Sequence, residues 1–164
     1  MATDELRIED DPSAADVAQL NDQLYRFNAA TTGTDDGRWL AIFVRDAAGQ
    51  IEAGLHGWTW GRMGFVETLW VREDLRRHGL GARLLAAAER EAERRGCREI
   101  QLATHSYQAP EFYRRLGYQA IGELPGWPGD STRIFFRKTL PGPNRATATS
   151  AGSPRTSSRR SSQA

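Results

Sequence analysis

The apolar positions along the chain follow two different periods, which predict helices and strands. Residues 11–30 and 80–95 repeat apolar side chains every three or four positions, as amphipathic helices do. A shorter helix is predicted over residues 108–117, where Pro110 suits the first turn and Gly117 the end. Compact β-branched and aromatic runs bounded by turn residues predict strands over residues 5–10, 39–46, 51–60, 65–71, 98–104, 118–124 and 131–140.

The two longer helices each carry one apolar stripe. In the first helix Ser13 is the expected N-cap, because its hydroxyl can accept a hydrogen bond from a free amide of the first turn. The stripe of this helix consists of Val17, Leu20, Leu24 and Phe27. The stripe of the second helix consists of Leu80, Leu84, Ala88 and Ala92. Each stripe is expected to pack on a sheet.

The predicted order is β-α-β-β-β-α-β-α-β-β, which combines an antiparallel meander with a later crossover. Residues 65–71 and 98–104 are joined through the helix over 80–95, and such a crossover pairs two strands in parallel. We therefore expect an α/β (α+β) domain over residues 1–140, with a mixed central sheet of about seven strands and helices on both faces. Residues 141–164 are rich in Ser, Thr, Arg, Gly and Pro, which predicts a disordered tail.

Composition and charge argue against several classes of protein. With 39% apolar and 26% charged residues, the chain is typical of a soluble globular domain. No apolar run is long enough to cross a membrane, and the acidic residues 1–11 lack the apolar core of a secretory signal. Residues 1–140 carry 18 basic and 21 acidic side chains, a net charge of −3, so no nucleic-acid binding is expected.

Cys97 is the only cysteine. One cysteine cannot form an internal disulfide or a cysteine-clustered metal site, and it fits a reducing, cytoplasmic location. Cys97 lies at a predicted helix-to-strand junction with no partner motif beside it, so we expect a small buried packing residue. No metal is expected.

The segment RRHGLG, residues 76–81, lies between a predicted strand and the long helix. The free amides at a helix start, the helix dipole and the small size of glycine together make such a turn an anion site. A Walker loop requires Lys and then Ser or Thr after its last glycine, whereas Gly81 is followed by Ala and Arg. A dinucleotide fingerprint requires a third glycine where Leu84 stands. The remaining interpretation is a pyrophosphate bound without a metal by backbone amides, Arg76 and Arg77.

Two segments of the chain match the pattern of a known family. The stretch LWVREDLRRHGLGARLL resembles the signature of the GNAT superfamily of N-acetyltransferases, Q/R-x-x-G-x-G/A. Its fixed positions are occupied by Arg76, Gly79 and Gly81. The stretch APEFYRRLGY resembles a second segment of the family, A-x-x-x-Y-x-x-x-G-F/Y. Its fixed positions are occupied by Ala109, Tyr113, Gly117 and Tyr118. The resemblance spans roughly residues 4–140.

The resemblance implies acetyl-coenzyme A as co-substrate, with its pyrophosphate against the backbone of residues 76–82. The pantetheine arm would pair with the strand that ends at Val71, like an added strand. The cofactor-binding residues expected on this basis are Leu69, Trp70, Val71, Arg76, Arg77, His78, Gly79, Leu80, Gly81, Ala82 and Ser106. Many family members have asparagine in the place of Ser106, which could here cap the short helix.

Two residues are candidates for catalysis. Alternation along residues 65–71 places Glu67 on one face with Phe65, Leu69 and Val71, and an apolar setting would raise the pKa of its carboxyl toward that of a useful base. The resemblance also implies a base at Glu67, acting directly or through water. Exposure to solvent or pairing with an arginine is the equal alternative. Tyr113 resembles the family tyrosine that protonates the leaving thiolate, with a core aromatic as its alternative.

Recognition of the acceptor rests on aromatic residues. Trp58 and Trp60 alternate along the strand beside the active strand, and Trp127 lies in a predicted loop over residues 125–130 that could overhang the cleft. Aromatic rings attract cationic amines, although packing in the core explains these tryptophans equally well. His105, at the end of a strand, is an alternative base with a structural role as the simpler interpretation.

The leading hypothesis is an enzyme that transfers acetyl from acetyl-CoA to a primary amine of a small molecule, with a general base and a tyrosine acid. Acetylation of a protein N-terminus, a lysine or an aminoacyl-tRNA is the alternative within the family. A non-catalytic acyl-CoA-binding module is the alternative from another class. Neither a membrane nor a nucleic acid is expected as a partner, and a homodimer is left open.

Overall fold

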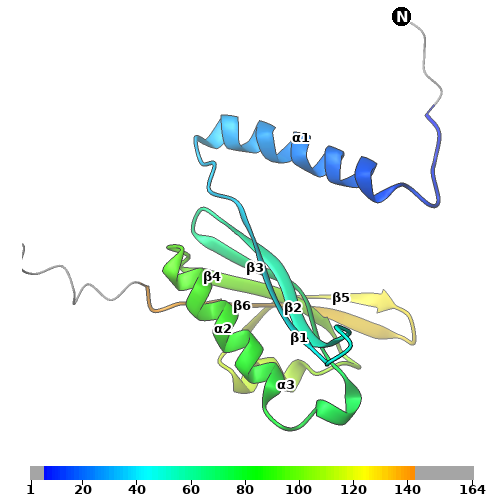
Figure 1. Cartoon of the computed structure of the whole chain (residues 1–164), viewed down its shortest axis with the longest axis vertical. Coiled ribbons are helices and arrows are strands. Elements are labelled where there is room, and N and C mark those ends of the chain that lie inside the picture. Colours follow the sequence, from blue (N-terminus) through cyan, green and yellow to red (C-terminus); the bar gives the residue numbers. More distant parts are fainter. Residues whose placement is uncertain (1–5, 143–164) are drawn as a thin grey trace, which may run out of the picture.

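The computed structural model describes residues 6–142. Its helices are α1 (Ala14–Thr32), the short 3-10 helix η1 (Glu73–Leu75), α2 (Leu80–Arg94) and α3 (Pro110–Arg115). Its strands are β1 (Arg38–Arg45), β2 (Ile51–Trp60), β3 (Met63–Val71), β4 (Glu99–His105), β5 (Gln119–Trp127) and β6 (Ser131–Thr139). From α1 onward, their order is the one predicted from the sequence (Figure 1).

The strands form a single mixed sheet in the order β1-β2-β3-β4-β6-β5. As predicted, only β3 and β4 are parallel, because α2 provides the crossover between them. Their pairing is short: it runs from Met63 opposite Glu99 to Val66 opposite Leu102 and then stops. The second half of β3 is therefore separated from β4, and the sheet opens at that point.

The core lies between one face of the sheet and the helices α2 and α3. The predicted stripe of α2 is confirmed, since Leu84, Ala88 and Ala92 are buried and Leu80 packs against the core from its edge. Burying a large apolar side chain stabilises a fold by about 1.5–3 kcal/mol. The largest fully buried side chains are those of Phe136, Leu55, Leu85, Ile100 and Cys97. The expectation that Cys97 is a buried packing residue is thus confirmed, and burial raises the pKa of its thiol.

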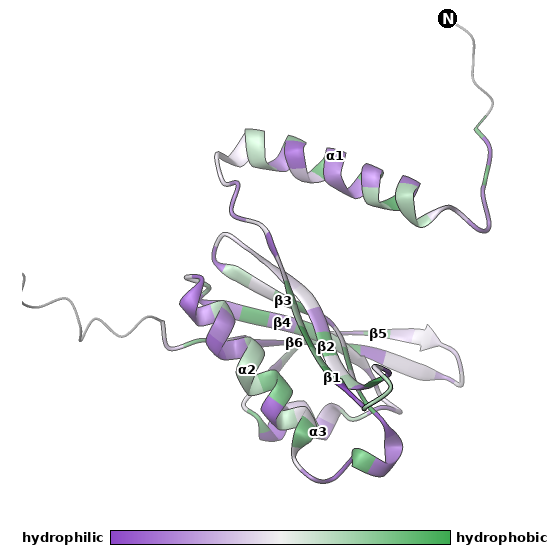
Figure 2. Ribbon diagram, in the orientation of Figure 1, coloured by the Kyte–Doolittle hydropathy of each residue, from purple (hydrophilic) through white to green (hydrophobic). Residues whose placement is uncertain are grey.

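The prediction of helices on both faces is wrong. Both α2 and α3 lie on the same face of the sheet, and α1 stands clear of it (Figure 1). The N-cap prediction is confirmed, because the Ser13 hydroxyl accepts a hydrogen bond from the Asp16 amide at 3.1 Å. Nevertheless α1 buries no side chain, and the residues of its apolar stripe are exposed (Figure 2).

The sheet has six strands within residues 6–142, where about seven were predicted. The difference is the expected strand over residues 5–10: its described part, residues 6–10, is not in a strand. Without a strand beside β1, that edge of the sheet ends at β1. The predicted disordered tail lies outside the described residues except for Pro141 and Gly142. No helix within the described range is both long enough and apolar enough to cross a membrane.

Candidate active site

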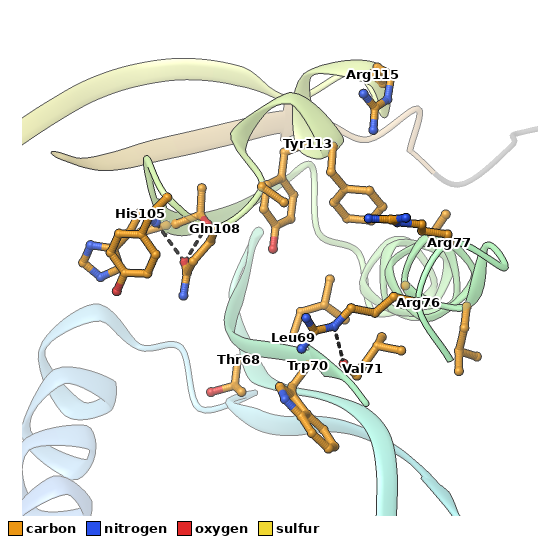
Figure 3. Close-up of a pocket in the computed structure, with 18 of the residues that line it drawn as sticks. Thr68, Leu69, Trp70, Val71, Arg76, Arg77, His105, Gln108, Tyr113 and Arg115 are labelled. Atoms are coloured by element: carbon orange, nitrogen blue, oxygen red, sulfur yellow. Dashed lines mark hydrogen bonds between the residues drawn. The ribbon is translucent and has the colours of Figure 1, made fainter. Parts of the chain in front are cut away.

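A cleft of about 940 Å³ lies where β3 and β4 separate. Its walls are the second half of β3, the segment from Leu75 to Ala82, the end of β4 and the start of α3. Such a volume is within the range of small-molecule and cofactor sites. In Figure 3 the side chain of Tyr113 lies between two groups of polar residues, with Arg76 and Arg77 on one side and His105 and Gln108 on the other. We call the side with Arg76 and Arg77 the loop end of the cleft, and the side with His105 and Gln108 the His105 end.

The loop end is formed by the backbone at the start of α2. Gly79 is the N-cap, with a left-handed φ of 76°, and it provides no side chain to cap the first turn. The amides of Leu80, Gly81 and Ala82 therefore lack intrahelical acceptors and lie in the lining of the cleft. Together with the helix dipole, they form a site for an anion.

Arginine side chains add positive charge to this end. Arg76 donates from Nε to the carbonyl of Val71 at 2.8 Å, which fixes its guanidinium over the end of β3 (Figure 3). Arg77 has a φ of 66°, an unfavourable conformation for a residue with a side chain. Such strained residues cluster at functional sites, and here the strained residue lies in the anion loop.

The backbone of β3 faces the cleft at two positions. Hydrogen-bonded pairs alternate along an antiparallel ladder. The Arg72 amide donates to the Glu52 carbonyl of the neighbouring strand β2, which makes Gly54 and Trp70 the next bonded pair. The amides and carbonyls of Leu69 and Val71 consequently point away from β2, into the opening beside β4.

Tyr113 is the buried titratable residue of the cleft. It lies on α3, packs against Phe112, Tyr118 and Phe136, and still contributes to the lining. Burial raises the pKa of its phenol above the ordinary value of 10. The hydroxyl therefore keeps its proton at neutral pH and can donate it.

Glu67 occupies a β-bulge, which corrects the prediction from alternation. The register of β3 against β2 shifts between His56 and Gly57, so Glu67 has no cross-strand partner. The extra residue reverses the alternation: Phe65 contacts a tryptophan of β2 on one face, whereas Leu69 packs against the core on the other. The Glu67 side chain is 58% exposed, and its Oε2 lies 3.5 Å from Nδ1 of His56.

The His105 end is formed by side chains. Gln108 Oε1 accepts hydrogen bonds from the Thr104 hydroxyl at 2.7 Å and from the His105 amide at 2.9 Å. An amide N–H can only donate, so the accepting atom is the oxygen, and the Gln108 NH₂ group remains as a donor. His105 stacks on Tyr107 with ring centroids 5.3 Å apart and meets the edge of Trp127 at 4.8 Å.

Comparison with known proteins identifies the family. The family model described as "Acetyltransferase (GNAT) family" matches residues 3–118, which is more than half of the chain. The chain belongs to the GNAT acetyltransferase family. As a GNAT protein it is an acyltransferase, and the resemblance stated from its two sequence motifs is confirmed.

Individual relatives agree with this assignment. Blasticidin-S acetyltransferase of Streptomyces morookaense is 40% identical over 104 residues, which cover 61% of this chain and 74% of that protein. The crystal structure of an acetyltransferase from Agrobacterium tumefaciens has a TM-score of 0.73 and 30% identity, covering 82% of this chain and 98% of its own. An aminoglycoside 6'-N-acetyltransferase complexed with coenzyme A shares the fold, with a TM-score of 0.55 and 24% identity over 65% of this chain and 76% of that one.

Most of the residues predicted for a GNAT site line the cleft. They are Glu67, Leu69, Trp70, Val71, Arg76, Arg77, Gly79, Leu80, Gly81, Ala82, His105 and Tyr113. His78 does not: it is exposed and outside the lining. Ser106 also lies outside it, because its hydroxyl accepts from the Thr132 amide at 3.1 Å. Ser106 does not cap α3 either, since the N-cap is Ala109 and no side chain caps that helix.

The predicted acceptor tryptophans do not line the cleft. Trp58 packs against Phe65, and Trp60 donates from Nε1 to the Thr34 carbonyl at 2.8 Å near the start of β1. Trp127 is not in a loop as predicted: it is the last residue of β5, paired with Ser131, because the turn begins only at residue 128. It still contacts His105 and so lies behind the His105 end of the cleft.

The lining residues that the sequence did not predict for the GNAT site include three at its His105 end. Gln108 and Tyr107 follow β4 and belong to no motif, and Arg133 lies on β6, where nothing distinguishes it from its neighbours. The pairing of β4 with β6 places Arg133 directly opposite His105. Only this tertiary pairing, and no local pattern, indicates that Arg133 reaches the cleft.

Proposed function

We propose that this acyltransferase transfers the acetyl group of acetyl-CoA to a primary amine of a small molecule in the cytoplasm. The observation that supports it most is one cleft in which an uncapped helix N-terminus, an open strand edge and a buried tyrosine converge. The first two suit a coenzyme with a pyrophosphate and an amide-rich arm. The third suits protonation of the thiolate that acyl transfer releases.

The residues of the loop end fit coenzyme A. The amides of Leu80, Gly81 and Ala82 would bind the pyrophosphate, and Arg76 and Arg77 would supply compensating charge. The outward-facing backbone of Leu69 and Val71 would bind the pantetheine amides as an added strand does. The Val71 carbonyl already accepts from Arg76, so the arm would share this oxygen with that side chain or displace it toward the phosphates. Once bound, acetyl-CoA supplies the activated acyl group.

Two residues would move the protons of the reaction. Glu67 takes the proton that the attacking amine releases, directly or through water, as the carbon–nitrogen bond forms. Tyr113 donates its hydroxyl proton to the sulfur as the carbon–sulfur bond breaks. The backbone amides of Leu69 or Val71 would stabilise the negative charge that develops on the carbonyl oxygen. His56, beside Glu67, would hold that carboxylate at the bulge.

A small acceptor is favoured over a macromolecule for two reasons. The relative with 40% identity is named for acetylation of a small molecule, blasticidin S. In addition, the His105 end of the cleft is lined by the aromatic and polar side chains of Tyr107, Gln108 and Arg133, a mixture that is typical of small-molecule sites.

Release of free thiol from acetyl-CoA, measured over a panel of small amines and peptides, tests the proposal. Turnover with small amines supports it. Turnover with peptides alone would favour acetylation of a protein N-terminus or lysine. Tight binding of coenzyme A with no turnover on any acceptor would favour a binding module, and absence of coenzyme A binding would overturn the site itself.

A further inference from the structure

Arg133 lies at the His105 end with its guanidinium on aromatic rings. Its guanidinium carbon is 5.3 Å from the ring centre of Trp127 and 5.6 Å from that of Phe135. Such cation–π contacts hold an arginine in place without neutralising its charge. None of the ion pairs found in residues 6–142 includes Arg133. A half-buried positive charge in the lining of a cleft therefore lacks a carboxylate partner within the described chain.

A second polar group at this end is also unsatisfied. His105 Nδ1 is buried and has no hydrogen-bond partner among the described residues. Buried polar atoms in native proteins are almost always hydrogen-bonded to protein, water or a ligand. His105 and Arg133 are opposite each other in the β4–β6 pairing, so the two unsatisfied groups lie on neighbouring strands at the same level of the sheet. The Gln108 NH₂ group lies beside them as a further donor.

We propose that Arg133, with Gln108 beside it, binds a carboxylate of the acceptor while its amine lies toward Glu67 and Tyr113. Arginine binds a carboxylate through two parallel hydrogen bonds, which gives both charge and orientation. The loop end already provides two arginines for the phosphates of the donor, on the other side of Tyr113 (Figure 3). Arg133 therefore binds the acceptor and not the donor, and the substrate class is a small amine that also carries a carboxylate.

This inference rests on the proposed acetyl transfer, and matched pairs of amines test it separately. The pairs are 5-aminopentanoate with pentylamine and lysine with cadaverine, which differ in their carboxylate. For the wild-type protein we expect kcat/KM to be at least about tenfold higher for the carboxylate-bearing member, the scale of one charged hydrogen-bonded pair. Arg133→Gln should remove this preference by lowering kcat/KM for the carboxylate-bearing member toward that of its partner, and Arg133→Lys should restore part of it.

Arg137→Gln is the matched control, because Arg137 lies four residues further along β6 and pairs with Glu99 away from the cleft. It should leave the preference intact. Equal rates for both members of each pair in the wild-type protein would overturn the carboxylate site, as would a preference that survives Arg133→Gln. Absence of thiol release with every amine would instead contradict the proposed function.

A second inference comes from a different part of the molecule, the unpartnered helix α1. Its apolar stripe of Val17, Leu20, Leu24 and Phe27 is exposed, with Phe27 at 67%. The face of the sheet opposite α2 carries a partly exposed group of aromatic side chains, which we call the aromatic face. It consists of Trp39, Phe43, Trp58 and Trp70, with Trp39 70% exposed. Exposed apolar surfaces of this kind mark interaction sites.

The connection after α1 holds the helix away from its own sheet. The Tyr25 hydroxyl donates to Asp35 at 2.7 Å and accepts from the Gly37 amide at 2.9 Å. Asp36 accepts from the Gly61 amide at 2.7 Å, at the turn between β2 and β3. A Cβ on Gly37 would lie 2.6 Å from the Tyr25 ring, so glycine is needed for this approach. In the structure these contacts hold α1 where its stripe does not cover the aromatic face of the same chain.

We infer that two copies of the chain exchange α1, each helix covering the aromatic face of the other copy. Every chain carries both halves of the contact, which is the requirement for a symmetric two-fold interface. A 19-residue helix is about 28 Å long, close to the roughly 33 Å of the ten-residue β2. Trp70 belongs both to the aromatic face and to the cleft lining, so the helix of the second copy would border the opening of the cleft.

The areas involved are sufficient for a stable dimer. A covered aromatic side chain buries about 150–250 Å², so Phe27, Trp39, Phe43 and Trp70 at their present exposure would contribute about 500 Å² per copy and about 1,000 Å² per dimer. The aliphatic side chains of α1 add to this, and stable interfaces bury about 1,200–2,000 Å² in total.

Analytical ultracentrifugation at micromolar concentration tests the exchange. We expect the wild-type protein to sediment at twice 18.3 kDa. Leu24→Glu on the helix and Phe43→Glu on the face should each give a folded monomer, with folding checked by circular dichroism. The control Asn21→Glu, on another side of α1, should remain a dimer. A wild-type monomer would overturn the inference.

Mixing the two monomeric variants distinguishes exchange from any other dimer. An intact helix of the Phe43→Glu chain can still cover the intact aromatic face of the Leu24→Glu chain, so the mixture should form a heterodimer with one functional contact. If the mixture remains monomeric, α1 of one copy does not contact the aromatic face of the other, and the inference is wrong.

Discussion

The two ends of the cleft are constructed from different groups. The loop end is one continuous segment, residues 75–82, and it presents mainly backbone amides at the start of a helix. The His105 end collects side chains from β4, the turn after it and β6, which are up to 29 positions apart between Thr104 and Arg133. Backbone amides can bind a phosphate in any protein that has this turn. Side chains from separate strands can change one at a time, so this end can differ among relatives that share the donor site.

The largest effect is expected at the loop end, from a side chain placed on Gly81. A Cβ there would lie 3.5 Å from Phe112, an ordinary contact, so Gly81→Ala should fit and change the dissociation constant of coenzyme A less than about threefold. Gly81→Trp should fill the cleft at the N-terminus of α2 and block the amides that bind the pyrophosphate. Loss of these charge-assisted hydrogen bonds should weaken coenzyme A binding by about 100-fold or more. Isothermal titration calorimetry on both variants measures this; equal affinities would contradict the assignment of the loop.

A smaller effect is expected at the bulge, where the acceptor amine would lie. Glu67→Gln retains the shape of the side chain and removes its ability to take a proton. We expect kcat to fall by about 10- to 100-fold, while the dissociation constant of coenzyme A remains unchanged, because Glu67 lies at the bulge of β3 and not in the loop. Steady-state thiol release and calorimetry separate the two quantities. An unchanged kcat would eliminate Glu67 as the base and leave His105 as the candidate.

The smallest effect is expected away from the cleft, where ion pairs on α2 connect this helix to β1. Glu91 on α2 accepts from Arg94 and Arg95, whose guanidinium groups hold its pKa at about 2 instead of 4.5. Arg95, 13% exposed, in turn donates to the Trp39 carbonyl at 2.9 Å. Glu91→Gln should lower the free energy of unfolding at pH 7 by about 1 kcal/mol without altering either end of the cleft.

The pH dependence gives the sign of this contribution. A carboxyl with a lowered pKa in the folded state stabilises the fold above its unfolded value, and this contribution is lost as the pH falls. The stability of the wild-type protein should therefore converge on that of Glu91→Gln between pH 4.5 and about 2. Urea unfolding at a series of pH values measures both curves, and a constant gap between them would exclude the ion pair as the cause.

The same contrast explains how much of the molecule could be predicted from its sequence. The strands from β1 to β6, the stripe of α2 and the loop end follow from local periodicity and from one continuous motif. The position of Arg133 depends on which strand pairs with β4, and the exposure of Glu67 depends on one inserted residue in β3. Both are consequences of register between distant segments, which local patterns do not contain.

The placement of α1 shows the same limit in another form. The sequence predicted the helix, its Ser13 cap and its apolar stripe, all of which the structure contains. A stripe indicates that a helix has a partner, but it does not indicate which surface the partner is. Here the contacts of Tyr25, within the helix, and of Asp36, after it, decide its direction, and they involve residues 10 to 25 positions apart.

The central claim is that acetyl transfer in this cleft requires the proton of Tyr113, and Tyr113→Phe tests it most directly. Phenylalanine retains the ring that packs against Tyr118 and Phe136, so the fold and coenzyme A binding should be preserved. Single-turnover transfer to an amine should slow by about 100-fold or more, with the dissociation constant of coenzyme A within about twofold of the wild-type value. An unchanged transfer rate in the folded variant would contradict the account.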